Sequence, residues 1–191
     1  MHIFINEREV GALDAIGTTV GEMIEALGVH VDPNEIVTTV ELDGVRYSAG
    51  EEERFARRAA ASVGRLVLGT STRAAFAAGM RGELADALEV VASKVDSVVA
   101  LFRRGDDRAA NALLAALLEE MRLALVLEQQ VTTLDGCVAR DGAETVTAIA
   151  PELLAAQEQR AWGTVATLLG DRLSPALRAW SHGQRALTGS R

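Results

Sequence analysis

The chain of 191 residues is 49% hydrophobic and has a formal net charge of −8. This apolar content is ample for a packed core, which excludes a disordered chain, and the negative charge disfavours binding to nucleic acid. No apolar stretch approaches the roughly 20 residues of a membrane-spanning helix, and residues 1–6 lack the pattern of a signal peptide. We therefore expect no nucleic-acid partner and no membrane association.

Cys137 is the only cysteine, so no internal disulfide can form. This usage is typical of a reducing cytoplasm. Lys94 is the only lysine among the 19 basic residues, and the heavy use of alanine, arginine and glycine suggests a GC-rich bacterial genome. We therefore expect a bacterial cytoplasmic protein.

Residues 1–70 alternate between short strand patterns and one helical pattern. The alternation of apolar and polar residues predicts strands over residues 2–7, 10–13, 36–42, 45–48 and 65–69. A helix is predicted over residues 20–27, where Thr19 and Glu22 form a capping box and Gly28 ends the helix. Asp43-Gly44 predicts a tight hairpin turn, and residues 51–62 are typical of a polar helical turn or short helix.

The order strand, strand, helix, strand, strand, short helix, strand, together with the opening Met1-His2-Ile3-Phe4-Ile5, resembles the ubiquitin-like β-grasp. The resemblance covers residues 1–70 and implies that the first strand lies centrally, parallel to the last. Domains of this kind serve as protein modifiers, sulfur carriers or docking modules. Modifiers and carriers react through a free C-terminal Gly-Gly, whereas this last strand runs through Gly69-Thr70-Ser71 into residues 72–191. The resemblance therefore implies a docking module.

Residues 71–191 form a second, all-helical domain by their sequence pattern. A lead-in helix is predicted over residues 72–80, weakened by Gly79 and Gly82, and two long helices over residues 84–134. Later helices are predicted over residues 152–160, 162–169 and 175–187, with Pro151 and Pro175 in first turns. Two helix–break–helix units of this kind predict a four-helix bundle. The fold class expected for the chain is therefore α+β, a β-grasp followed by an α-helical bundle.

The first long helix carries an apolar seam of heptad type. Its members are spaced alternately by four and three residues: Leu84, Leu88, Val91, Val95, Val98 and Phe102. Such a seam requires a partner helix, in the same chain or in another. We expect these side chains to be buried, and we favour a homodimer because heptad seams are common dimer contacts.

Candidate catalytic residues are few. Cys137 lies in a loop beside Arg140, and a neighbouring arginine favours the reactive thiolate. The three histidines are spread along the chain without the spacing of metal ligands or of a base near the cysteine. Phosphate-binding glycine motifs are missing. We expect no catalytic residue, metal or cofactor, and we expect Trp162 and Trp180 to anchor the last helices.

Phe4 is the candidate for a docking face on the first domain. Side chains on a strand alternate, so Phe4 points away from the face shared by Ile3 and Ile5. We expect either the chain's own helices or another protein to cover it.

The leading hypothesis is a non-enzymatic interaction protein, an adaptor or scaffold subunit. The alternative is an acidic helical chaperone for secretion or flagellar export, because such chaperones are small, acidic, helix-rich and without catalytic groups. An enzyme that uses the Cys137 loop is the third possibility.

Overall fold

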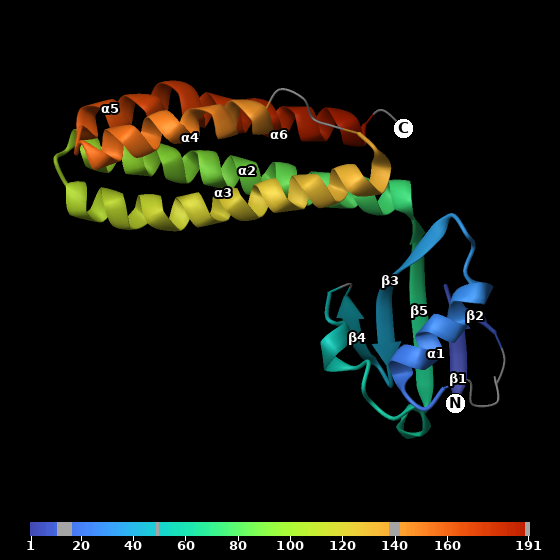
Figure 1. Cartoon of the computed structure of the whole chain (residues 1–191). Helices are drawn as coiled ribbons and strands as arrows, with labels where there is room; N and C mark the ends of the chain where they lie inside the picture. Colours follow the sequence, from blue (N-terminus) through green and yellow to red (C-terminus); the bar gives the residue numbers. More distant parts are fainter. Residues whose placement is uncertain (11–16, 49, 138–141, 190–191) are drawn as a thin grey trace. The chain divides into compact units, whose positions relative to one another are not determined.

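The computed structural model describes residues 1–10, 17–48, 50–137 and 142–189 (Figure 1). The chain divides into two compact units, Met1–Phe76 and Ala77–Arg191, which we treat separately as the sheet unit and the helical unit. The chain is thus α+β, with a mixed sheet first and helices after it. In the described part of the chain, no helix is both long and apolar enough to cross a membrane.

The sheet unit contains a five-stranded mixed sheet. Its strands are β1 (His2–Ile5), β2 (Arg8–Glu9), β3 (Glu35–Leu42), β4 (Val45–Ser48) and β5 (Arg65–Thr72), in the order β2-β1-β5-β3-β4. β1 pairs with β5 in parallel, with Ile3 opposite Leu66 and Ile5 opposite Leu68, and the other pairs are antiparallel. The interior, parallel placement of β1 was predicted from the sequence and is confirmed.

Helix α1 (Val20–Leu27) begins and ends where the sequence predicts. The Thr19 side chain accepts a hydrogen bond from the backbone N–H of Glu22, and the Glu22 carboxylate accepts one from the N–H of Thr19. This capping box satisfies donors that have no partner within the helix. The buried face of α1 packs with Ile3 and Ile5 in one core. A 3₁₀ turn, η1 (Gly28–His30), follows α1.

Three details of the sheet unit differ from those expected. The chain reverses early, because Asn6 and Glu7 both have positive φ (47° and 67°), and β2 lies at Arg8–Glu9. Of the strand predicted at 10–13, residues 11–13 lie outside the described residues. The expected helical turn at 51–62 is two 3₁₀ turns, η2 (Glu52–Arg54) and η3 (Ala60–Ser62).

The third difference concerns the end of the sheet. Gly69-Thr70-Ser71 is not a joint between domains, because β5 continues to Thr72 and these residues pair with the start of β3. A bulge at Thr38 lies opposite Gly69. The strand therefore crosses the boundary between residues 70 and 71 that the sequence suggested.

The helical unit is a bundle of long helical segments around one core. Its elements are α2 (Arg73–Arg103), α3 (Asp107–Asp135), α4 (Ala143–Glu158), α5 (Trp162–Thr167), the π-helical turn η4 (Leu168–Leu173) and α6 (Ser174–Thr188). α5, η4 and α6 follow one another without a break, and the helices lie alongside one another in Figure 1. α2 ends at Arg103, and Gly105 in the following turn has a φ of 77°. The Asp106 carboxylate caps α3.

The heptad seam lies in this core. All six side chains, Leu84, Leu88, Val91, Val95, Val98 and Phe102, are buried among residues of α3, α4, α5 and α6. Phe102 stacks on Trp162 with ring centres 5.5 Å apart, and Trp180 is 1% exposed, so both tryptophans anchor the last helices as expected. The seam is therefore covered by its own chain. The homodimer stays a prediction and needs a surface other than this seam.

The helix boundaries differ from those expected. α2 is one helix of 31 residues, because packing of the residues around Gly79 and Gly82 outweighs the weak helix propensity of glycine. Pro151 lies inside α4 rather than in its first turn. The predicted gap between residues 169 and 175 is the π-helical turn, so only Pro175 lies near the start of its helix.

Candidate functional site

Phe4 lies on the face of the sheet opposite Ile3 and Ile5, as the alternation of the strand predicts. It is half-buried, and the Arg65 guanidinium lies 5.1 Å from the centre of its ring. Arg65 also pairs with Glu41, whose carboxylate is 3.3 Å away. A side chain of the neighbouring strand thus covers part of Phe4, and the docking role of this face stays a prediction.

Cys137 is half-buried just after α3. Its backbone N–H donates to Asp135 Oδ1 at 2.9 Å, and its carbonyl oxygen accepts from Arg81 Nη2 at 2.5 Å. These contacts hold the backbone at the end of the helix. Arg140, the expected neighbour of the thiol, lies outside the described residues.

A buried ionic cluster around Arg81 was not predicted from the sequence. The Arg81 guanidinium donates to both carboxylate oxygens of Asp135, at 3.1 and 2.8 Å, and to Gln184 Oε1 at 2.7 Å. Gln184 in turn donates to Glu128, and the side chain of Arg81 is only 1% exposed. Burial lowers the pKa of Arg81, but hydrogen bonds and charge from Asp135, with the charge of Glu128, outweigh it and raise the pKa. The arginine is therefore permanently charged.

This Arg81 cluster joins three helices, because its members come from α2, α3 and α6. The side chains of Arg81, Asp135 and Glu128 are buried, and that of Gln184 is fully buried, so the cluster ties the three helices together inside the helical unit. Among the described residues, no group of three or more His, Cys, Asp or Glu side chains is arranged to hold a metal ion.

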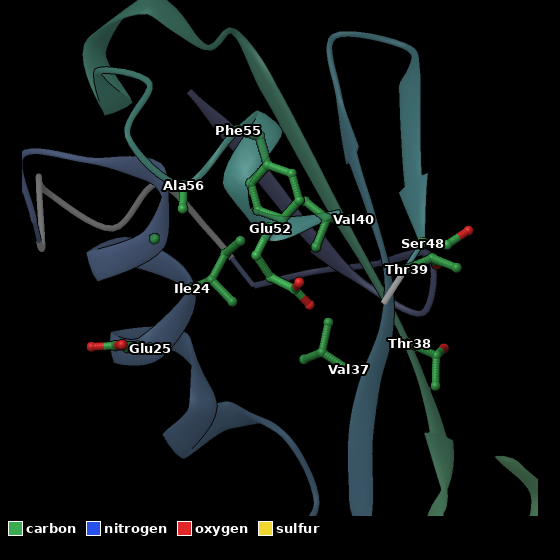
Figure 2. Close-up of a pocket in the computed structure, with 11 residues that line it drawn as sticks. Ile24, Glu25, Val37, Thr38, Thr39, Val40, Ser48, Glu52, Phe55 and Ala56 are labelled. Carbon is green, nitrogen blue, oxygen red and sulfur yellow. The ribbon is translucent and has the colours of Figure 1, made fainter. Parts of the chain in front are cut away.

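The feature best suited to bind a partner is a groove between α1 and β3 in the sheet unit. It encloses about 260 Å³, and its lining residues are Gly21, Ile24, Glu25, Val37, Thr38, Thr39, Val40, Ser48, Glu52, Phe55 and Ala56 (Figure 2). We call it the α1–β3 groove. Ile24 and Phe55 form one wall and Val37 the other, so the space between them is mainly apolar.

Backbone hydrogen bonds fix one wall of the groove to α1. The N–H groups of Val20 and Gly21, which have no partner within the helix, donate to the carbonyl oxygens of Arg58 and Ala56 at 2.9 and 3.0 Å. Gly21 permits this approach, because a Cβ atom there would lie 3.2 Å from the Ala56 oxygen. Phe55 is 4% exposed, because it packs in the core of the sheet unit.

Glu52 brings a negative charge to the groove. Figure 2 shows its side chain between Ile24 and Val37, and its carboxylate accepts a hydrogen bond from the N–H of Gly50 at 3.0 Å. Hydrogen bonds from the backbone N–H groups of Gly50 and of Glu52 itself lower the pKa of the Glu52 carboxyl. The groove thus offers an apolar slot next to an ionised carboxylate.

The lining residues that the structure describes include no His, Cys, Lys or Arg. Their polar groups are the two carboxylates of Glu25 and Glu52 and the hydroxyl groups of Thr38, Thr39 and Ser48.

This groove was not predicted from the sequence, which indicated Phe4 as the docking residue instead. The groove combines α1, β3 and the segment after β4, and no single pattern in the sequence connects them. One signal was available: the predicted strand 36–42 is longer than its hairpin partner 45–48, which leaves part of one strand uncovered.

A scan against protein-family models finds no match, and no curated protein or solved structure matches the chain. Function is therefore inferred from the geometry described above.

Proposed function

We propose that the chain is a non-enzymatic adaptor or scaffold subunit of a bacterial cytoplasmic complex, and that its sheet unit binds a partner protein in the α1–β3 groove. The observation that carries this proposal is the groove itself: an apolar slot of about 260 Å³ with walls already in place. Clefts of this kind bind when they are apolar, preformed and equipped with a few polar groups that set orientation.

We propose further that the sheet unit is a ubiquitin-like β-grasp. Support comes from the mixed sheet, from the interior and parallel position of β1 beside β5, and from helix α1, which packs on one face of the sheet. Because β5 passes directly into α2, the use of such a domain for docking fits better than its use as a modifier. The lone Cys137 supports the cytoplasm as its location.

The Phe4 face of the sheet is a weaker candidate for docking. The hollow on this face, about 370 Å³, is lined by both acidic and basic side chains, among them Glu7, Glu41 and Arg46. Arg65 already covers part of Phe4. The α1–β3 groove combines more apolar lining with a charge of one sign, and we therefore prefer it.

The test compares two substitutions of an aliphatic residue by lysine. Ile24→Lys places a cation inside the groove beside Glu52, whereas Val29→Lys makes a similar change in η1, where Val29 is 82% exposed and outside the groove. Affinity-tagged wild type and both variants are purified from the native host, after circular dichroism has established that each is folded. Bound proteins are then quantified by mass spectrometry.

We expect a folded partner to purify with the wild type and with Val29→Lys but to be lost with Ile24→Lys. Equal recovery with all three proteins would exclude the groove as the docking site. Recovery of one constant unfolded client would favour the chaperone alternative. A catalytic activity that disappears in Cys137→Ser would favour the enzyme instead.

A further inference from the structure

The two strands of the hairpin beside the groove differ in length. β3 has eight residues, Glu35–Leu42, but β4 pairs only with Thr39 to Leu42. On its other side, β3 is paired with β5 along its length apart from the bulge at Thr38. Among the residues that the structure describes, no strand therefore pairs with the outer edge of β3 from Glu35 to Thr38.

This uncovered edge carries unused hydrogen-bonding groups. In an antiparallel sheet, every second residue of a strand points its N–H and C=O away from a given neighbour. Glu35 donates its N–H to the carbonyl oxygen of Asp32 at 2.8 Å. In the described part of the chain, no hydrogen bond reaches the backbone of Ile36, Val37 or Thr38 from the outer side. The outward-facing backbone groups of the stretch from Ile36 to Thr38 thus offer a pairing edge of the kind that natural sheets usually cover.

The same edge borders the α1–β3 groove. Val37 and Thr38 belong to the groove lining, and Figure 2 shows Val37 directed toward Ile24 while Thr38 lies on the opposite side of β3. A segment laid along β3 would continue the line of β4. Because side chains of a strand alternate between its faces, every second side chain of that segment would point into the groove.

We infer that, if the groove binds a partner as proposed above, it does so by strand addition. An extended segment of the partner pairs with β3 at Ile36 to Thr38, directs an apolar side chain into the space between the Ile24–Phe55 wall and Val37, and places a lysine or arginine beside Glu52. Main-chain hydrogen bonds then contribute affinity, and the groove selects the side chain.

The negative charge of the sheet unit favours a basic residue in the partner segment. The sheet unit, residues 1–76, contains 12 acidic and 7 basic residues, a difference of −5. No ion pair is formed by Glu52 or by Glu25 of the groove among the described residues. A cationic segment is therefore attracted to the sheet unit and completes the groove, whereas an acidic one is repelled.

The probe is a displayed library of random dodecapeptides, selected on the full chain. Enriched peptides are synthesised and their affinities measured for wild type, Ile24→Lys, Val29→Lys and Glu52→Gln. A second series carries one N-methylated backbone amide at each position in turn. Hydrogen exchange of Ile36, Val37 and Thr38 is followed with and without peptide.

We expect the selected peptides to share an apolar residue near a lysine or arginine. Ile24→Lys should abolish binding, Val29→Lys should leave it unchanged, and Glu52→Gln should weaken it and reduce its dependence on salt. N-methylation at alternate positions should weaken binding about tenfold for each hydrogen bond lost. The backbone amides on the outer edge of β3 should exchange more slowly in the complex.

Three results would contradict the inference, each in a distinct way. Peptides that need Ile24 but tolerate N-methylation everywhere would leave the groove as a docking site and exclude strand addition. Failure to select any peptide that distinguishes Ile24→Lys from Val29→Lys would remove both proposals. Sedimentation showing a dimer of the chain that Ile24→Lys dissociates would identify a second copy, rather than a basic partner segment, as the occupant.

Discussion

Arg81→Met is the substitution whose effect the structure defines most sharply. The guanidinium connects α2 to Asp135 of α3 and to Gln184 of α6, and the side chains of Arg81 and Asp135 are 1% and 5% exposed. Glu128, with a side chain 9% exposed, lies 3.9 Å from the same guanidinium. Methionine fills much of the space but leaves two buried carboxylates without the cation that faces them.

The expected cost is large because solvent cannot replace the lost charge. Removing one partner of a buried ion pair typically costs about 3–5 kcal/mol. Domains have a free energy of unfolding of roughly 5–15 kcal/mol, so Arg81→Met should remove on the order of a third of the stability of the helical unit. Urea unfolding followed by tryptophan fluorescence measures this directly, because Trp162 and Trp180 both lie in that unit and are the only tryptophans.

Arg122→Met is the matched control. Arg122 pairs with Glu119 on α3 at 2.6 Å, but these side chains are 62% and 60% exposed, and exposed pairs contribute little to stability. A midpoint for Arg81→Met that shifts no further than that of Arg122→Met would refute the reasoning. Adding Asp135→Asn and Glu128→Gln to Arg81→Met should restore part of the lost stability, because the negative charges that faced Arg81 are then removed.

Four further predictions concern stability. Leu88→Asp puts a charge at a fully buried seam position and should cost several kcal/mol in urea unfolding; an unchanged midpoint would place Leu88 outside the core. Gly142→Ala should lower the melting temperature, because its Cβ would lie 2.1 Å from that of Trp180; wild-type stability would contradict this close approach. Glu7→Gly should stabilise the sheet unit by about 1 kcal/mol, since Glu7 has a φ of 67° that favours glycine; thermal unfolding that shows no gain would count against strain. Hydrogen bonds from the backbone and hydroxyl of Thr18 and from Thr19 hold the pKa of Glu22 below 4.5, so its carboxylate stabilises above that pH and the contribution is lost as pH falls through the lowered pKa. Glu22→Gln should therefore reduce the melting temperature at pH 7 and reduce it progressively less as the pH falls and the carboxylate is protonated, and an equal reduction at every pH would exclude the charge as the cause.

The sequence alone determined those elements that depend only on interactions between residues close together in the chain. The boundaries of α1 follow from Thr19 and Glu22, which satisfy each other's backbone donors across three residues. The turn between β3 and β4 follows from Asp43 and Gly44, which adopt positive φ at 49° and 87°. The burial of the seam from Leu84 to Phe102 follows from its period alone, because one face of a helix must be covered.

Other features were decided only when distant segments met. Gly79 and Gly82 weaken a helix locally, yet α2 runs through them because Ala77, Arg81 and Leu84 pack in the bundle. The heptad pattern shows that the seam must be buried, but it does not determine whether helices of the same chain or of another chain bury it. In the structure, α3, α4 and α6 of the same chain do so.

The Arg81 cluster and the α1–β3 groove were likewise decided only by the packing of segments distant in the sequence. Arg81, Asp135 and Gln184 are each ordinary surface residues by type, and they become a buried network only because three helix ends converge. The groove depends on where β4 stops beside β3 and on how the segment near Phe55 is attached to Gly21. Sequence patterns report which face of an element is apolar, whereas cavities and buried charges depend on the spaces between elements, and tertiary packing alone sets those spaces.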